Sequence, residues 1–375
     1  MKRKNELEVL RVISMLMVLI LHTLGHGGIL YSYAQESFGY FFFWLIETFC
    51  LVAVNCFLLI TGYVMLNAKF RPSRIITLIL QTEFYSTLCT LIVSIIFQKE
   101  VSVYQWILSF FPLTSGRYWF MSAYFIILIF FPTFNKFILS IDRGTHFLVN
   151  TGLILTFSVI PTILFWSKGI FGNGYQYTWF IVLYFIGAYY KKYKAEYQEI
   201  NVKNIYYYIL FIGGGYCSKI ILDHLHIKGI FALLNSDIFL FYNSLIYLEA
   251  GCYLFKLFIQ NFPNSKGNIK YVAYLGKYVL GAYLISDHEI IRESLWQWLK
   301  PFEYMKTHTL MELMSYIILI VLGTFILGIL LEYTRQKIIY IIKLDKILLK
   351  IDDLMLAWIK KLIKEKKENV GFSKK

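Results

Sequence analysis

The chain has 375 residues, of which 58% are hydrophobic and 19% aromatic, and its mean hydropathy is +0.58. This composition excludes a soluble or disordered chain and indicates an integral membrane protein. The formal net charge is +14, but no soluble basic surface with exposed base-reading side chains is visible, so we expect no nucleic-acid partner.

Apolar runs recur from end to end, and ten of them are long enough to cross a hydrocarbon core, which takes about 20 helical residues. The run after MKRKNE continues past the length of a signal peptide, so we expect the first segment to stay in the protein. We therefore predict an all-α, polytopic membrane protein with about ten transmembrane helices, forming a transmembrane domain over residues 1–334. The runs are Leu7 to Leu24, Phe38 to Leu66, Ile75 to Phe97, Trp119 to Leu139, Phe147 to Trp166, Thr178 to Tyr190, Ile205 to Leu222, Ile238 to Ile259, Val272 to Ile291 and Leu310 to Tyr333.

Lysine and arginine gather on alternate connections between these runs, which by the positive-inside rule marks the cytoplasmic side. Both termini are therefore expected in the cytoplasm, and a multi-pass cell membrane protein, in a bacterial plasma membrane, is the expected setting. The residues that set this orientation are Lys2, Arg3, Lys4, Lys69, Arg71, Arg74, Lys136, Arg143, Lys191, Lys192, Lys194, Lys203, Lys256, Lys266 and Lys270.

Residues 335–375 form a basic tail with twelve Lys or Arg and five Asp or Glu, which supplies +7 of the net charge. Apolar residues such as Ile338, Leu348 and Trp358 interleave with the lysines. This pattern is typical of an amphipathic helix on an anionic lipid surface, so membrane lipids are expected partners of the tail.

The first apolar run, LRVISMLMVLILH at residues 10–22, contains an arginine and a histidine. Eleven steps of about 100° return to nearly the same helix face, so Arg11 and His22 share one stripe, roughly 16 Å apart along the axis. Glu8 precedes Arg11 by three residues and is placed to pair with it. The pair alone is equally compatible with a structural salt bridge and a histidine that donates to a neighbouring helix.

Two further segments add polar groups to the apolar background. The run VAVNCFLLITGYVM at residues 52–65 carries Asn55, Thr61 and Gly62, where a helix or a ligand can approach closely. The segment KFRPSR follows it, and Arg71 and Arg74 at a helix start favour an anion such as phosphate. The alternative is that these two arginines only supply positive-inside charge.

Together these segments resemble the acyltransferase-3 family of membrane acyltransferases. The resemblance rests on the Arg and His of the first run, CFLLITGY at residues 56–63, the Arg-x-x-Arg pair, and YWFMSAYFIILIFFP at residues 118–132, which reads as a helix that ends in a proline. Thr61 and Cys56 stand where serine and phenylalanine are usual. AYLISDHEII at residues 282–291 is similar to a late family segment, with His288 displaced by two places.

The resemblance implies an O-acetyltransferase that moves an acyl group, usually acetyl, from acetyl-CoA on the cytoplasmic side to a hydroxyl of a surface polysaccharide or a lipid-linked sugar. Histidine suits a base that titrates near neutrality, so His22 is the expected base or transient acyl carrier. Arg11, paired with Glu8, is expected to steer the pantetheine arm or the thioester carbonyl. Arg71 and Arg74 are the expected ligands of the CoA phosphates.

Low-ranking candidates for acceptor binding are Asn55, Arg117, Trp119 and His288, and for Arg117 and Trp119 an anchor at the membrane interface is the alternative. The five cysteines show no paired metal spacing, and no metal is expected. A polysaccharide polymerase, a flippase and a small-molecule transporter are alternatives of another class, but neither large loops nor internal repeats are visible.

Overall fold

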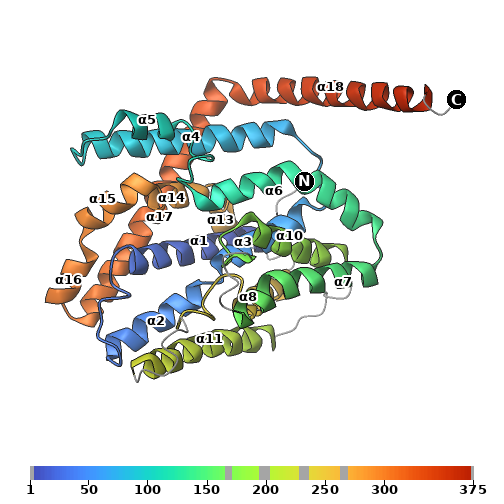
Figure 1. The fold of residues 1–375 in the computed structure, drawn as a ribbon. Helices are drawn as coiled ribbons and strands as arrows, with labels where there is room; N and C mark the ends of the chain where they lie inside the picture. Colours follow the sequence, from blue (N-terminus) through green and yellow to red (C-terminus); the bar gives the residue numbers. More distant parts are fainter. Residues whose placement is uncertain (1–3, 165–170, 194–202, 228–235, 262–268, 373–375) are drawn as a thin grey trace.

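A computed structural model describes residues 4–164, 171–193, 203–227, 236–261 and 269–372, and all the regular elements within them are helical (Figure 1). This confirms the predicted all-α class. The elements are α1 (Asn5–Gly25), α2 (Phe38–Cys50), α3 (Ala53–Met65), α4 (Pro72–Ile95), α5 (Val103–Ser109), α6 (Trp119–Ser140), α7 (Arg143–Ile154), the π-helix η1 (Leu155–Val159), α8 (Ile160–Ile163), α10 (Tyr177–Lys192), α11 (Lys203–Ile227), α12 (Leu245–Asn261), α13 (Ile269–Leu275), α14 (Leu280–Ser286), α15 (Glu289–Leu299), α16 (Pro301–Thr307), α17 (Leu310–Ile341) and α18 (Leu344–Phe372).

Seven segments within the described residues are helical, long and apolar enough to cross a membrane. They match seven of the ten predicted runs, and the longest, α17, has 32 residues. The 28-residue span Phe38–Met65 joins α2 and α3, and Arg143–Ile163 joins α7, η1 and α8. The seven spans are Asn5–Gly25, Phe38–Met65, Pro72–Ile95, Trp119–Ser140, Arg143–Ile163, Lys203–His226 and Leu310–Ile341.

The other three predicted runs differ from a simple spanning helix. The run Thr178 to Tyr190 is helical as α10, which has only 16 residues. The run Ile238 to Ile259 begins in turns and becomes helical only at Leu245. The run Val272 to Ile291 is divided among α13, α14 and α15, so the prediction of one continuous helix there is wrong. The break between α14 and α15 falls at Asp287 and His288, and His288 caps α15 by accepting from the Ile291 amide.

Helix α6 does not end at its proline. Pro132 lies inside the helix, which continues to Ser140, so the predicted proline-ended helix is wrong. A proline in a helix interior lacks one backbone donor, but it does not prevent a long apolar helix from continuing when neighbours pack around it.

Helix α10 lies at the centre of the molecule and packs most closely on α3. A Cβ added at Gly62 would lie 2.1 Å from the Tyr184 carbonyl oxygen, and one at Gly187 would lie 2.3 Å from the Leu59 carbonyl oxygen. The two helices therefore cross backbone against backbone, with a glycine on each side. This confirms the expectation that another helix approaches closely at Gly62.

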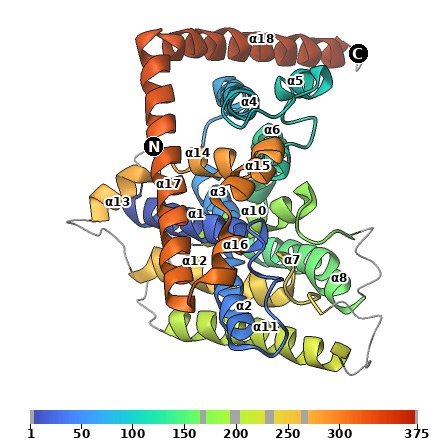
Figure 2. The same cartoon turned by 90° about the vertical axis from the view of Figure 1, so that its left-hand side faces the viewer.

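Helix α1 is the other central element, and it contacts α2, α3, α12, α13, α14 and α17. Both views show it running through the middle of the bundle, with α17 along one side (Figures 1 and 2). A side chain on α1 therefore has protein neighbours around most of the helix, which is where a polar group in a membrane is tolerated.

The basic tail is mostly one helix, α18, which turns away from the end of α17 (Figure 2). Its Asp352 accepts hydrogen bonds from the backbone N–H and the hydroxyl of Ser73, at 2.6 and 2.7 Å, so α18 is fastened to the start of α4. Four of the five cysteines are buried, whereas Cys217 is exposed. Of the basic residues used to predict orientation, Lys2, Arg3, Lys194 and Lys266 lie outside the described residues.

Candidate active site

A cavity of about 660 Å³ lies beside α1. A volume of this size is typical of a site for a small molecule. Its wall includes residues from α1, α2, α3, α6, α14 and α15 and from the connections that follow α1 and flank α10, α12 and α14. The polar and aromatic members are Arg11, His22, His26, Tyr31, Glu47, Thr61, Trp119, Tyr124, Tyr175, Tyr242, Lys277, Tyr283, Asp287 and Arg292.

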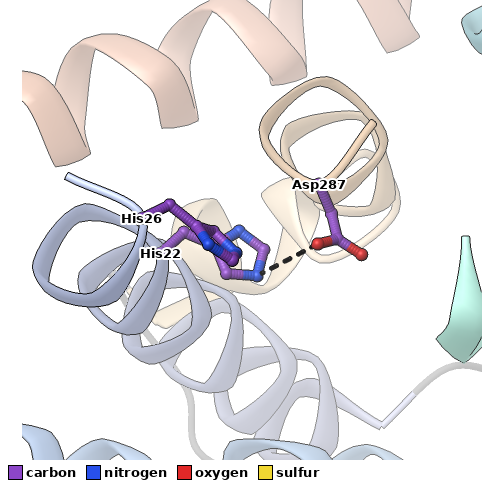
Figure 3. Close-up of side chains that lie close together, drawn as sticks. All are labelled: His22, His26 and Asp287. Atoms are coloured by element: carbon purple, nitrogen blue, oxygen red, sulfur yellow. Dashed lines mark ion pairs between the residues drawn. The ribbon is translucent and has the colours of Figure 1, made fainter. Parts of the chain in front are cut away.

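His22 faces the end of α14 within this cavity (Figure 3). Its Nδ1 lies 2.9 Å from the Ser286 hydroxyl oxygen, and its Nε2 lies 3.8 Å from Asp287 Oδ1. Only 13% of its side chain is exposed. The imidazole is thus held between a hydroxyl and a carboxylate, and it comes from a different helix than either of them.

The hydrogen bonds around Ser286 are compatible with both imidazole tautomers. The Ser286 hydroxyl lies 3.3 Å from the Tyr283 carbonyl oxygen and 2.9 Å from His22 Nδ1, so it can donate to either one. When Nδ1 carries the proton, Nε2 has the lone pair that a general base needs, and when Nε2 carries it, that proton faces Asp287.

His26 lies one turn beyond His22, with 5.3 Å between the ring centroids (Figure 3). Burial, with the neighbouring His22 and Arg292, lowers the pKa of His26 to about 4, so this ring is uncharged at neutral pH. Arg292 Nη1 lies 3.5 Å from Asp287 Oδ1 and supplies the positive charge at this carboxylate.

His22, His26 and Asp287 each offer one ligand atom, and these three atoms lie within 4.8 Å of one another. Three such ligands are sufficient for a catalytic zinc ion. Arg292, however, already faces the carboxylate, and a guanidinium beside a divalent cation is unfavourable. The absence of a metal therefore stays a prediction.

The predicted pair of Glu8 and Arg11 is present on the same face of α1. Arg11 Nη1 donates to the Glu8 carboxylate, Glu8 is buried, and Arg11 lines the cavity. A Cβ added at Gly276 would lie 2.6 Å from Glu8 Oε2, so this glycine lets the chain pass directly over the carboxylate. Lys277 follows in the cavity wall, so Arg11 and Lys277 form a cationic end of the cavity.

The predicted donor-phosphate ligands, Arg71 and Arg74, are exposed at the start of α4 and do not line the cavity. Arg71 is the N-cap residue of α4, as expected for a helix start. The structure thus places both arginines outside the cavity.

Asn55 is buried and does not line the cavity. Its amide donates to the carbonyl oxygens of Tyr242 and Tyr247 at 2.9 and 3.0 Å and accepts from Trp179 Nε1 at 3.0 Å. These contacts leave Asn55 holding other segments in place, including the segment that carries the cavity residue Tyr242.

Arg117 and His288 contact each other, but outside the cavity. Arg117 Nη1 lies 3.2 Å from His288 Nε2, and its Nη2 donates to the Gln105 carbonyl oxygen at 2.8 Å. Both residues are buried and neither lines the cavity. Trp119, two residues after Arg117, does line it.

Sequence reasoning missed Ser286, Asp287, His26 and Arg292 as site residues. A signal was present, because Ser286, Asp287 and His288 are three consecutive polar residues in an apolar run. The sequence does not show which of the three faces α1, since this depends on the helix break at Asp287.

A family model described as an acyltransferase domain matches residues 4–332. The match includes every residue of the cavity wall and ends within α17. No curated protein and no solved structure matches the chain.

Proposed function

Because the chain belongs to the acyltransferase-3 family of membrane acyltransferases, we propose that it moves an acetyl group from cytoplasmic acetyl-CoA to a hydroxyl of a surface glycan or its lipid-linked precursor. The bacterial plasma membrane is the proposed location. The observation that carries the proposal is the position of His22, which contacts Ser286 and Asp287 and lines a cavity with a cationic end.

In the proposed reaction, His22 Nε2 takes the proton of the acceptor hydroxyl as its oxygen attacks the thioester carbonyl carbon. The new C–O bond forms, the C–S bond breaks, and the proton passes from the imidazolium to the leaving thiolate. Asp287, 3.8 Å from Nε2, stabilises the imidazolium while it exists, and Ser286 orients the ring.

A second route is that Nε2 attacks the thioester itself and carries the acetyl group before passing it to the hydroxyl. The same tautomer serves both routes, because each needs the Nε2 lone pair. The two differ in whether an acetylated protein accumulates when donor is supplied without acceptor.

The donor is proposed to enter at the cationic end of the cavity. Arg11 lies roughly 16 Å from His22 along α1, which an extended pantetheine arm can bridge. Arg71 and Arg74 are the proposed ligands of the CoA phosphates outside the cavity, and Lys277 adds a cation at its edge.

The alternative functions of polymerase, flippase and transporter lack a specific observation in their favour. The cavity holds a base positioned by a hydroxyl and a carboxylate, which transport alone does not require. An uptake or flipping activity without consumption of acetyl-CoA would nevertheless replace the proposal.

The test is acetyl-CoA consumption by the purified protein in nanodiscs, with and without a glycan acceptor. Thiol release that depends on acceptor, together with acetyl ester on the glycan, supports the proposal. A His22→Ala variant should abolish both, whereas His226→Ala, at an exposed position of α11, serves as the matched control. Thiol release that His22→Ala leaves intact would overturn the assignment.

A further inference from the structure

Three aromatic rings meet on the cavity wall away from Arg11. Trp119 and Tyr242 lie nearly parallel, with 12° between their planes and 6.0 Å between their centroids. Tyr175 contacts both, at 4.6 Å from Trp119 and 5.0 Å from Tyr242. All three line the cavity, and they come from three segments that are far apart in the sequence. We refer to these three residues as the aromatic wall.

The aromatic wall is held from behind by polar contacts. The Asn55 amide donates a hydrogen bond to the Tyr242 carbonyl oxygen, and the Asn243 amide donates to the Gly172 carbonyl oxygen at 3.2 Å. A Cβ added at Gly174, where φ is +93°, would lie 2.7 Å from Tyr242 Cβ. The segments that carry Tyr175 and Tyr242 are therefore fastened to each other, which gives the rings a fixed arrangement before any ligand binds.

Glu47 adds a carboxyl group to the same cavity. It lines the wall from α2, and its Oε2 is buried without a hydrogen-bond partner among the described residues. A buried polar oxygen without a partner is unfavourable, and a ligand hydroxyl can supply the missing hydrogen bond. Glu47 and the aromatic wall line the same cavity.

We propose that the aromatic wall and Glu47 form a subsite for one pyranose ring of the acceptor, whose C–H face packs on the rings while a ring hydroxyl forms a hydrogen bond with Glu47. The inference rests on the proposed function, since it names the part of the cavity that holds the glycan. It assigns acceptor binding to Tyr175, Tyr242 and Glu47, and it places the candidate acceptor ligand Trp119 in the same subsite.

Aromatic rings with a carboxylate also suit a quaternary ammonium ligand. Such a ligand is best enclosed by rings that face it from several directions, whereas Trp119, Tyr175 and Tyr242 contact one another in a single cluster. One cluster of rings leaves the rest of the ligand to hydrogen-bonding groups, so the geometry favours a pyranose with its hydroxyls.

The direct test is saturation-transfer NMR with methyl glucoside, methyl galactoside and methyl N-acetylglucosaminide on the protein in nanodiscs, with choline as the cationic probe. The variants are Tyr175→Leu and Glu47→Gln. Tyr177→Leu is the matched control, because Tyr177 is similarly exposed, lies two residues away and does not line the cavity. Tyr175 is 44% exposed, so its replacement should preserve the fold.

We expect at least one glycoside to receive saturation in the parent and in Tyr177→Leu, with a roughly five- to tenfold weaker apparent affinity in Tyr175→Leu. In the transfer assay, the acceptor KM should rise in both cavity variants while the donor KM stays unchanged. Saturation of choline but of no glycoside would overturn the pyranose assignment, as would equal affinity in Tyr175→Leu and Tyr177→Leu.

The two proposals fail in different ways. Acetyl transfer to a glycan with unaltered acceptor KM in both cavity variants would remove the subsite and leave the proposed function standing. Glycoside binding that needs Tyr175, in a protein that never releases thiol from acetyl-CoA, would keep the subsite and remove the proposed function.

Discussion

At the residue scale, the contacts of His22 predict a graded set of activity losses. His22→Ala should reduce kcat by at least about a hundredfold, because the base is gone. Asp287→Asn removes the charge beside Nε2 but keeps the shape, so a smaller loss of roughly tenfold is expected. Ser286→Ala should reduce kcat least, because only the hydrogen bond that orients the His22 ring is lost. Acetyl-ester formation at equal protein abundance measures all three. An Asp287→Asn enzyme with parental kcat would remove this carboxylate from the mechanism.

The second residue-scale prediction concerns metal binding by His22, His26 and Asp287, whose potential ligand atoms lie close together. Because Arg292 already faces Asp287, we expect that EDTA and phenanthroline leave the transfer rate unchanged. Metal analysis of the purified protein provides the independent check. A loss on chelation that added Zn²⁺ restores would mean that His22 is a metal ligand.

The third residue-scale prediction concerns Arg71 and Arg74. Changing both to lysine keeps the positive charge but removes the planar fork, so affinity for acetyl-CoA should fall by roughly tenfold or more. Binding to the double variant in nanodiscs measures this, and Arg143→Lys, at the start of α7, is the matched control. Unchanged affinity would move the phosphate site, and Lys277 would then be the first residue to test.

The part of the site that lies on one helix was predictable. Arg11, His22 and Glu8 share a face of α1 through helical periodicity alone, and the Glu8–Arg11 pair is confirmed. Asp287 was not predictable as a neighbour of His22, because this contact joins positions more than 200 residues apart. Asn55 looked like a ligand group in the sequence because its backbone partners near Tyr242 are visible only in the folded chain.

At the element scale, the crossing of α3 and α10 predicts sensitivity to a single methyl group. Gly62→Ala places a Cβ 2.1 Å from the Tyr184 carbonyl oxygen, so the helices must separate, at a cost of about 1–3 kcal/mol. Gly323→Ala in α17 is the matched control, since nothing lies within 4 Å of its Cβ and alanine favours a helix. Thermal unfolding followed by size-exclusion chromatography compares the two, and equal melting temperatures would contradict the close crossing.

The helices that differ from prediction have a common cause. Hydropathy identifies an apolar run, but it does not report where backbone hydrogen bonding is interrupted inside protein. Val272 to Ile291 is apolar throughout most of its length, yet it breaks at Asp287, where the carboxylate faces α1. An apolar run that carries site residues is thus less predictable than α17, which is one continuous helix of 32 residues.

At the scale of the whole molecule, charge predicts the topology. A reporter fused after Lys192 is expected in the cytoplasm, and one inserted between residues 168 and 177 is expected outside, because basic residues gather at the α10 end that carries Lys191 and Lys192. Reporter activity in intact cells measures both fusions. The reverse pattern would invert the side from which the donor enters.

The shortness of α10 has a consequence for the bilayer around the protein. With 16 residues it is about 24 Å long, whereas the hydrocarbon layer is about 30 Å thick. The lipid bilayer does not have to become thinner around this helix, because residues Trp179 to Ala188 are almost all buried against other helices. This buried helix is therefore shorter than the hydrocarbon layer that the outer helices cross. In the proposed function, a donor and an acceptor that approach from opposite faces would meet in the cavity flanked by this short helix.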